Sequence, residues 1–150
     1  MSEENPVHGM TADECWELVR AQEFGRLAFH LADQVHITPI NYAVDGETLL
    51  FRTAEGSKLL AVVMNPDIAF EIDPYDEDEA WSVIIRGTAR HLDEFEEHRA
   101  ENVPLRPWVP TLKYDVVEIT PREISGRRFD LSRPWLHITP ESWPGEALPV

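Results

Sequence analysis

Four side chains near the middle of the chain could together hold an anion. Two cations and two hydroxyls stand within seven positions: Arg52, Thr53, Ser57 and Lys58. The pattern after Gly56 predicts a short helix over 57–64, whose N-terminus would add unpaired backbone amides. Phosphate binds at such places because the amides and the helix dipole favour an anion. Two of only 13 Lys and Arg residues lie here, which favours a phosphate site, although ordinary surface charges fit the pattern equally well.

Pro39 is a second unusual residue, because it lies inside a predicted strand over 34–44. Proline has no N–H to donate to a ladder, so this strand must lie at a sheet edge or face some other group. A planar ring with its own donors and acceptors could pair with the free backbone groups of residues 38–41. An irregular edge strand is the alternative interpretation.

Other kinds of catalytic site find little support. The sequence contains neither a Gly-x-Ser-x-Gly elbow nor a Walker phosphate loop. Its histidines show no His-Glu-x-x-His pattern and no paired spacing, so no zinc or other metal site is predicted. The acidic loop 73–79 is interpreted as solvated. Cys15 falls on the apolar face of the first predicted helix, which predicts a buried and unreactive thiol.

Composition limits the class of protein. The 150 residues include 28 Asp and Glu against 13 Lys and Arg, a formal charge of −15, which argues against broad binding to nucleic acid or anionic membranes. A single cysteine cannot form an internal disulfide. Apolar runs fall short of the roughly 20 residues of a membrane span, and the N-terminus is acidic where a signal peptide would be basic. We therefore expect a soluble, cytoplasmic protein.

The elements that must position these residues are mostly strands. A capping box at Thr11 to Glu14 predicts a helix over 11–22, and Asp45-Gly46 predicts a tight hairpin turn. The charged stretch 92–101 is helix-competent. Strands are predicted over 25–31, 34–44, 47–53, 67–73, 80–91, 113–120 and 122–130, the last two separated near Pro121.

Six or seven strands joined mostly by hairpins favour a mainly β protein, an antiparallel barrel with a few short helices. We expect one domain over 1–130. The Pro- and Trp-rich tail 131–150 should lie across the barrel or a partner subunit, because its tryptophans favour burial.

Several segments together resemble the pyridoxamine 5′-phosphate oxidase-like family over roughly residues 11–130. They are Gly25-Arg26-Leu27-Ala28, Pro39-Ile40-Asn41-Tyr42, the run from Phe51 to Lys58, Asn65-Pro66, and the run from Trp81 to Ala89. This resemblance implies an FMN-binding split β-barrel that forms a homodimer, with flavin sites at the subunit interface.

The resemblance also implies roles for individual residues. The residues that would line the isoalloxazine ring are Thr38, Pro39, Ile40 and Asn41. Those that would hold the FMN phosphate are Arg52, Thr53, Ser57 and Lys58. Trp81 and Ser82 would approach the flavin from the partner chain.

The sequence also departs from the true oxidase. Uncharged residues surround Ile37 where that enzyme has an arginine, and Lys58 stands alone where it has a basic pair. Arg127-Arg128 is the closest candidate for a basic C-terminal motif; an auxiliary phosphate or substrate contact and a pair of solvated arginines are equally good interpretations. The chain therefore resembles a related flavoprotein of the short bacterial type.

The expected function is that of an FMN-dependent oxidoreductase. No side chain is an evident acid–base catalyst, which agrees with chemistry carried by the cofactor. The alternatives are a deazaflavin-dependent reductase, a non-enzymatic flavin carrier or redox sensor, and a haem-handling barrel with a ligand such as His36.

Overall fold

The computed structural model describes residues 5–54, 56–105 and 115–132. Within these ranges strands predominate, and no helix is long and apolar enough to span a membrane. The elements, in chain order, are β1 (Val7–Met10), α1 (Ala12–Ala21), β2 (Phe24–Leu31), β3 (Gln34–Asn41), β4 (Ala43–Asp45), β5 (Thr48–Thr53), α2 (Ser57–Met64), β6 (Asp67–Ile72), β7 (Glu79–His91), the 3-10 helix η1 (Glu97–Asn102) and β8 (Asp115–Asp130).

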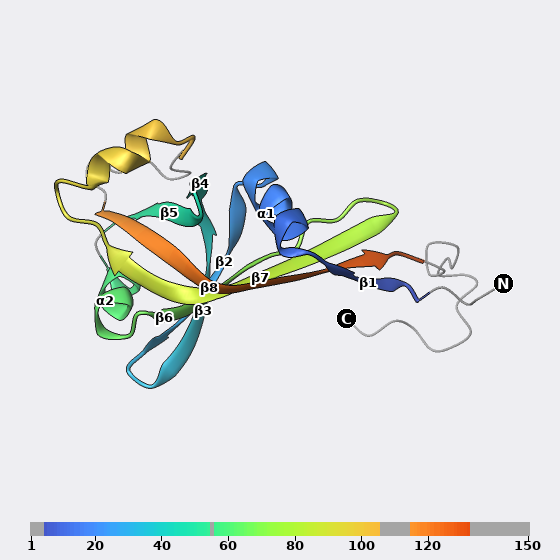
Figure 1. The fold of residues 1–150 in the computed structure, drawn as a ribbon. Coiled ribbons are helices and arrows are strands. Elements are labelled where there is room, and N and C mark those ends of the chain that lie inside the picture. Colours follow the sequence, from blue (N-terminus) through green and yellow to red (C-terminus); the bar gives the residue numbers. More distant parts are fainter. Residues whose placement is uncertain (1–4, 55, 106–114, 133–150) are drawn as a thin grey trace, which may run out of the picture.

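The strands form one antiparallel sheet that curls on itself. Its hydrogen-bonded order is β3-β2-β6-β7-β8-β5-β4, and β1 also pairs with β8. The strands at the two ends of this order, β3 and β4, follow each other in the chain, joined through Tyr42. The sheet must therefore curl to bring its ends together, as Figure 1 shows. This confirms the predicted antiparallel split barrel with few short helices.

The long strand β8 organises the sheet. One of its edges pairs with β7 along almost its whole length, and the other is shared between β5 and β1. The predicted interruption near Pro121 is wrong. Gly87 pairs with Pro121 but Arg86 pairs with Glu123, so the register shifts there. A β-bulge leaves a residue outside the ladder, and it lets proline stay within one continuous strand.

Other differences from the sequence prediction concern single elements. The predicted strand 34–44 is divided into β3 and β4 by Tyr42, and β1 is a strand that the sequence did not predict. The Tyr42 hydroxyl donates to the Val19 carbonyl over 2.6 Å, and its ring lies edge-on to Phe70 at 4.8 Å between centroids. The stretch 92–101 gives only the short 3-10 helix η1.

The core fills the inner face of the curled sheet. Its side chains come from alternate positions of β2, β6, β7 and β8, together with one face of α2. Members include Leu27, Phe70, Ile85, Val117 and Ile119, all almost fully buried. A smaller apolar cluster, which includes Leu50, Leu92 and Val116, lies between η1 and the sheet.

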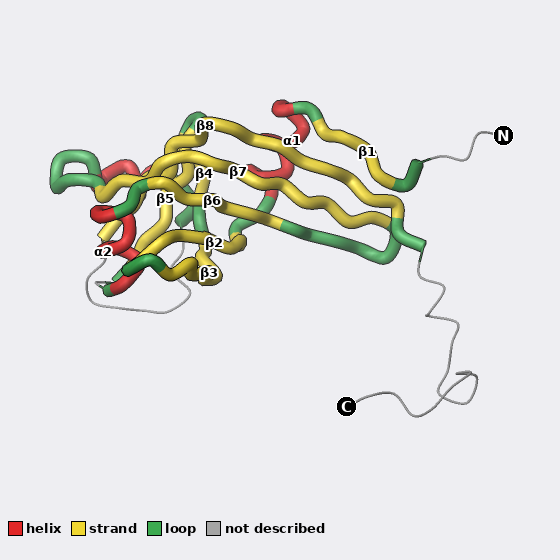
Figure 2. The backbone as a smooth tube through the Cα atoms, turned by 90° about the horizontal axis from the view of Figure 1, so that it is seen from below, coloured by secondary structure: helices red, strands yellow, loops and turns green. Residues whose placement is uncertain are grey.

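The first helix packs against the strand arm that extends from the barrel, which Figures 1 and 2 both show. Its capping box is present: Glu14 N–H donates to Thr11 Oγ1 at 3.2 Å, and Thr11 N–H donates to Glu14 Oε1 at 3.1 Å. Cys15 on this helix is fully buried, and burial raises the pKa of its thiol. This agrees with the predicted unreactive cysteine.

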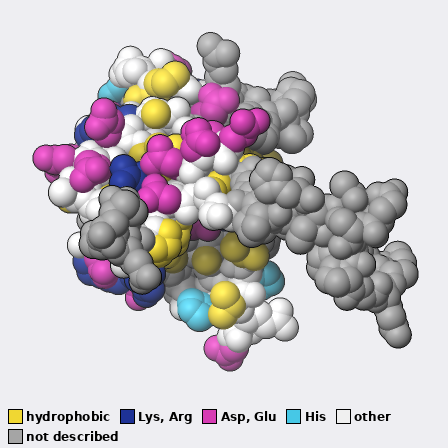
Figure 3. All heavy atoms as spheres, turned by 90° about the vertical axis from the view of Figure 1, so that its right-hand side faces the viewer, with side chains coloured by type: hydrophobic (Ala, Val, Ile, Leu, Met, Phe, Trp, Pro, Cys, Tyr) yellow, Lys and Arg dark blue, Asp and Glu magenta, His cyan; other side chains and the backbone are white. Residues whose placement is uncertain are grey.

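The outer surface is strongly acidic in places. In Figure 3, Asp and Glu side chains gather over the upper part of the face shown, with few basic side chains among them. This distribution follows from the formal charge of −15.

The contact between α1 and β8 depends on Gly126. A Cβ atom there would lie 2.6 Å from Cys15 Sγ and 3.2 Å from Met10 Sδ, which is too close for unchanged packing. Gly126→Ala should therefore lower the free energy of unfolding by about 1–3 kcal/mol, the usual cost of overpacking. Urea unfolding measures this cost.

Gly9 is a matched control for this substitution. It lies on β1, close to Gly126 in the neighbouring strand, but a Cβ atom at Gly9 would meet nothing within 4 Å. Gly9→Ala should leave stability unchanged or raise it slightly. Equal losses in the two variants would show that the contact with Cys15 is not the cause.

Candidate functional site

The first turn of α2 lacks the capping that α1 has. Its N-cap residue is Gly56, which has no side chain to donate or accept, and the first turn contains no acidic residue. By contrast, α1 has the Thr11 cap, and Asp13 and Glu14 in its first turn. The N-cap residue therefore leaves the first amides of α2 unpaired, and such amides favour an anion.

Lys58 lies in this turn, and no described residue supplies it with a counter-charge. The side chain is half-buried and has no hydrogen-bond or ion-pair partner among the residues that the structure describes. Burial lowers the pKa of its ammonium group below the ordinary value of 10.5. A charged amine that loses water without gaining a partner is destabilised, and a bound anion would supply that partner.

The end of β5 lies next to this turn. Arg52 and Thr53 are its last residues, and only residues 54–56 separate them from Ser57 at the start of α2. Arg52 is half-buried, whereas Thr53 is buried and donates from Oγ1 to the Ala54 carbonyl at 3.0 Å. The four residues predicted to hold phosphate therefore belong to one strand–loop–helix connection.

The segment predicted to face the flavin ring belongs to β3, at one end of the sheet order. Pro39 thus occupies a strand with a free edge, as its missing N–H predicts. Ile40 is buried and Thr38 pairs with buried Leu27, so both face the barrel interior. Pro39 and Asn41 alternate with them and face outward. Thr38 and Ile40 could therefore contact an outside ligand only through their backbone.

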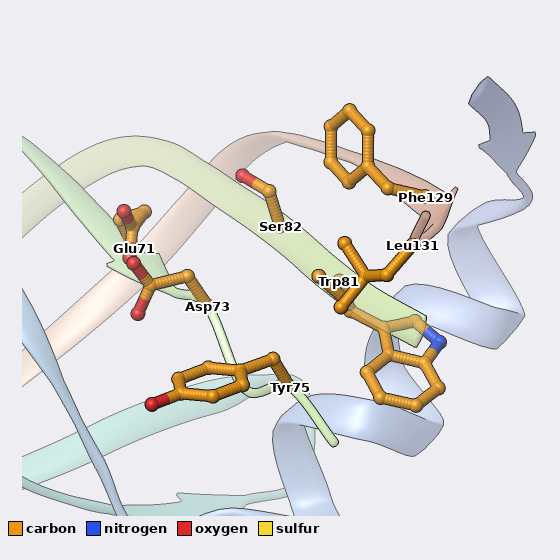
Figure 4. A pocket seen from close by; sticks show the side chains of 8 residues that line it. Glu71, Asp73, Tyr75, Trp81, Ser82, Phe129 and Leu131 are labelled. Carbon is orange, nitrogen blue, oxygen red and sulfur yellow. The ribbon is translucent and has the colours of Figure 1, made fainter. Parts of the chain in front are cut away.

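Trp81 and Ser82 lie near the start of β7, beside a hollow of about 500 Å³. Figure 4 shows Ser82 on one face of the strand, while the Trp81 indole turns toward α1. Sequence reasoning missed the other walls of this hollow, which come from β6, the acidic loop and β8. They include Glu71, Asp73, Tyr75, Phe129 and Leu131.

One arginine holds two of these acidic groups. Arg26 Nη2 lies 2.6 Å from Glu71 Oε1 and also pairs with Asp73. The acidic loop is largely exposed, as predicted, and its first residue, Asp73, also lines the hollow. The alternation of inward and outward side chains along β2 and β6 was the signal that could have revealed this pair. The sheet register places Arg26 opposite Glu71.

Arg127 and Arg128 of β8 lie opposite Ser82 and Trp81, which line this hollow. Arg127 pairs across the ladder with Ser82 and is exposed, without a partner among the described residues. Arg128 Nε lies 3.3 Å from Glu79 Oε2. Arg127 is therefore the better placed of the two to meet a ligand next to Ser82.

A single chain does not bring the residues predicted to hold phosphate close to Trp81 and Ser82. On β8, Arg52 pairs with Val116 and Ser82 pairs with Arg127, eleven positions farther along. Eleven strand residues span roughly 36 Å along the chain. Figures 1 and 2 agree, because both show α2 and the start of β7 far apart.

Comparison with known proteins assigns the chain to a family. Residues 11–128 match the family described as pyridoxamine 5′-phosphate oxidase. The chain belongs to this family. Its curled antiparallel sheet is the split barrel found in these proteins.

Individual family members resemble the chain closely. A Corynebacterium glutamicum protein, whose crystal structure is named after pyridoxamine 5′-phosphate oxidase, is 39% identical with a TM-score of 0.79; the match covers 87% of this chain and 98% of that one. The FAD binding protein from Mycobacterium smegmatis is 40% identical with a TM-score of 0.72, covering 83% and 100%. A Mycobacterium tuberculosis protein without an assigned function is 45% identical over 87 residues, which are 57% of this chain and 79% of that protein.

The half-buried charge of Lys58 has a consequence for stability. Lys58→Met removes the half-buried charge and keeps a side chain with similar helix propensity. The flavin-free variant should therefore unfold at a higher temperature than the unchanged protein at pH 7. Because the folded-state pKa is lowered, the penalty is full below that pKa and fades as pH rises toward 10.5.

Thermal unfolding of both flavin-free proteins between pH 7 and pH 10.5 measures this effect. The difference in Tm should shrink on the alkaline side. A Lys58→Met protein that melts below the unchanged protein at pH 7 would show that the ammonium stabilises the fold.

Proposed function

We propose that the protein binds FMN and acts as a flavin-dependent oxidoreductase. The observation that carries this proposal is the half-buried ammonium of Lys58, without a described partner, in the uncapped first turn of α2. A phosphate monoester would pair with Lys58 and with the amides of that turn. Arg52, Thr53 and Ser57 complete the group that would hold it.

The family supports a flavin as the group that carries this phosphate. The Mycobacterium smegmatis relative, 40% identical, is named as an FAD binding protein, and the match to the pyridoxamine 5′-phosphate oxidase family covers most of the chain. We favour FMN over FAD because its terminal phosphate suits the lone Lys58, whereas FAD would need further room for a nucleotide.

We also propose that two copies of the chain complete each site. In this arrangement the flavin ring lies along residues 38–41 of one protomer, and the partner subunit's Trp81 and Ser82 approach it. The separation along β8 supports this division, since roughly 36 Å of strand exceeds the length of an FMN molecule. Exposed apolar side chains on β3 support it too: Val35 is 73% and Ile37 is 70% exposed.

A bound flavin would supply hydride transfer, and the chain would supply position and electrostatics. Lys58 and the amides of α2 would fix the phosphate, and the free edge of β3 would offer backbone groups to the ring. The hollow beside Ser82 would admit the electron donor or acceptor. Reduction by NADH or NADPH under steady-state conditions distinguishes a reductase from a passive carrier.

Binding of FMN should depend on Lys58 far more than binding of riboflavin does. A charge-assisted hydrogen bond is worth roughly 1.5–3 kcal/mol, so Lys58→Met should weaken FMN binding roughly ten- to a hundredfold. Riboflavin has the same ring without the phosphate, and its affinity should scarcely change. Titration of both flavins against unchanged, Arg52→Met and Lys58→Met proteins measures the difference.

Arg20→Met is a control for the loss of one positive charge, because Arg20 is an exposed residue of α1 that lies over Trp16. This variant should bind FMN normally. If Lys58→Met weakens the binding of FMN and of riboflavin equally, the phosphate must bind elsewhere. If FAD or a deazaflavin binds more tightly than FMN, that molecule is the cofactor instead. A Soret band in the purified protein would indicate haem.

A shared site requires a dimer in solution. Light scattering at micromolar concentration should give twice the 17.2 kDa mass of the chain, and a specific interface should bury more than about 1,000 Å². A mass near that of one chain would contradict both the dimer and the shared site.

A further inference from the structure

Three potential metal ligands meet where the β7–β8 connection begins and ends. The donor atoms of His91, Glu97 and Asp115 all lie within 4.8 Å of one another. His91 ends β7, Glu97 begins η1, and Asp115 begins β8. Local spacing predicts no zinc site in this sequence, but spacing cannot detect ligands that three separate elements bring together.

Within the described residues, no Lys or Arg side chain pairs with the two carboxylates of this cluster. Among the described residues, the Glu97 carboxylate has no hydrogen-bond or ion-pair partner, and the Asp115 carboxylate has only His91, whose Nε2 lies 3.1 Å from Asp115 Oδ1. Like charges so close to each other are unfavourable unless a positive charge lies between or beside them. His91 supplies a positive charge only when its imidazole is protonated.

Two other carboxylates around the same connection, those of Glu118 and Asp45, are paired with arginine. Glu118, with a side chain only 7% exposed, lies between Arg90 Nε at 2.9 Å and Arg99 Nη2 at 2.6 Å. Asp45 accepts from Arg99 Nε at 2.8 Å. The cluster at His91 thus differs from its neighbours, because it has an imidazole where they have a guanidinium.

The supporting structure holds the three ligands in place. His91 and Asp115 are fixed by the β-ladder, opposite Val117 and Thr53 respectively. The short helix that includes Glu97 is anchored by buried Ala100 and by the ion pairs of Arg99. Binding would therefore need little rearrangement, which lowers its cost.

We propose that His91, Glu97 and Asp115 bind a divalent transition-metal ion of the zinc class. One imidazole nitrogen and two carboxylates suit such an ion better than Ca²⁺ or Mg²⁺, which prefer oxygen ligands alone. Zinc bonds of about 2.0–2.2 Å place neighbouring donors of a tetrahedral site roughly 3.3 Å apart, near the observed His91–Asp115 distance. The fourth position is open to water.

The ion would add a further link among three elements that the β7–β8 ladder and the ion pairs of Arg99 already hold together. It would tie the end of β7 to the start of β8 and hold η1 against both. Because the ligands converge only in the folded chain, binding would also stabilise the fold. The proposal concerns this connection and is independent of whether a flavin is bound.

Titration calorimetry with Zn²⁺ on chelator-treated full-length protein tests the proposal. We expect one ion per chain, and an increase in Tm on adding Zn²⁺. His91→Ala and Glu97→Gln should each weaken binding at least tenfold and abolish the increase in Tm. The Glu97 carboxylate has no partner among the described residues, so Glu97→Gln should fold normally and keep the test valid even if His91→Ala does not fold.

His8→Ala is the matched control. His8 Nε2 lies 2.8 Å from Asp130 Oδ2, a pair of the same chemistry without a third ligand within the described part of the chain. This variant should bind Zn²⁺ as the unchanged protein does. Absence of Zn²⁺ binding, equal losses in all three variants, or equal affinity for Mg²⁺ would overturn the proposal.

Discussion

The curl of the sheet depends on how the chain passes through Tyr42. This residue ends one extended segment and begins another, and its hydroxyl is held by the Val19 carbonyl at the end of α1. The chain can then leave one end of the sheet at β3 and re-enter the other end at β4. The hairpin that follows pairs with β8, which places the first turn of α2 at the end of the barrel. The position of the proposed phosphate group therefore depends on the path that the chain takes through Tyr42.

Much of the fold could be predicted from local chemistry, where a residue type has one strong structural preference. Thr11 and Glu14 marked the start of α1, and Asp45-Gly46 marked the β4–β5 hairpin, with Gly46 at a positive φ of 61°. The features that were not predicted depend on residues that are distant in the sequence. Few apolar residues mark β1, which is stabilised by the ladder of β8, and Pro121 remains within a strand because Gly87 opposite it accommodates a bulge. Both partners, β8 for β1 and Gly87 for Pro121, are far away in the sequence.

The same distinction applies to the candidate site. The phosphate group could be predicted because its residues share one short connection, so their spacing is itself informative. The hollow beside Ser82 could not, since Glu71, Tyr75 and Phe129 come from different strands and loops. The cluster of His91, Glu97 and Asp115 is a more extreme case. Its members come from three separate elements and meet only where β7 ends and β8 begins.

The apolar edge of β3 has a consequence for how the protein behaves in concentrated solution. Exposed Val35 and Ile37 on a strand with a free edge form a template on which another strand can add. The strong negative charge opposes such encounters at long range, but salt shortens that repulsion to about 8 Å at physiological ionic strength. Subunits whose β3 edge is uncovered would thus be colloidally stable in dilute buffer and would associate nonspecifically as salt is added.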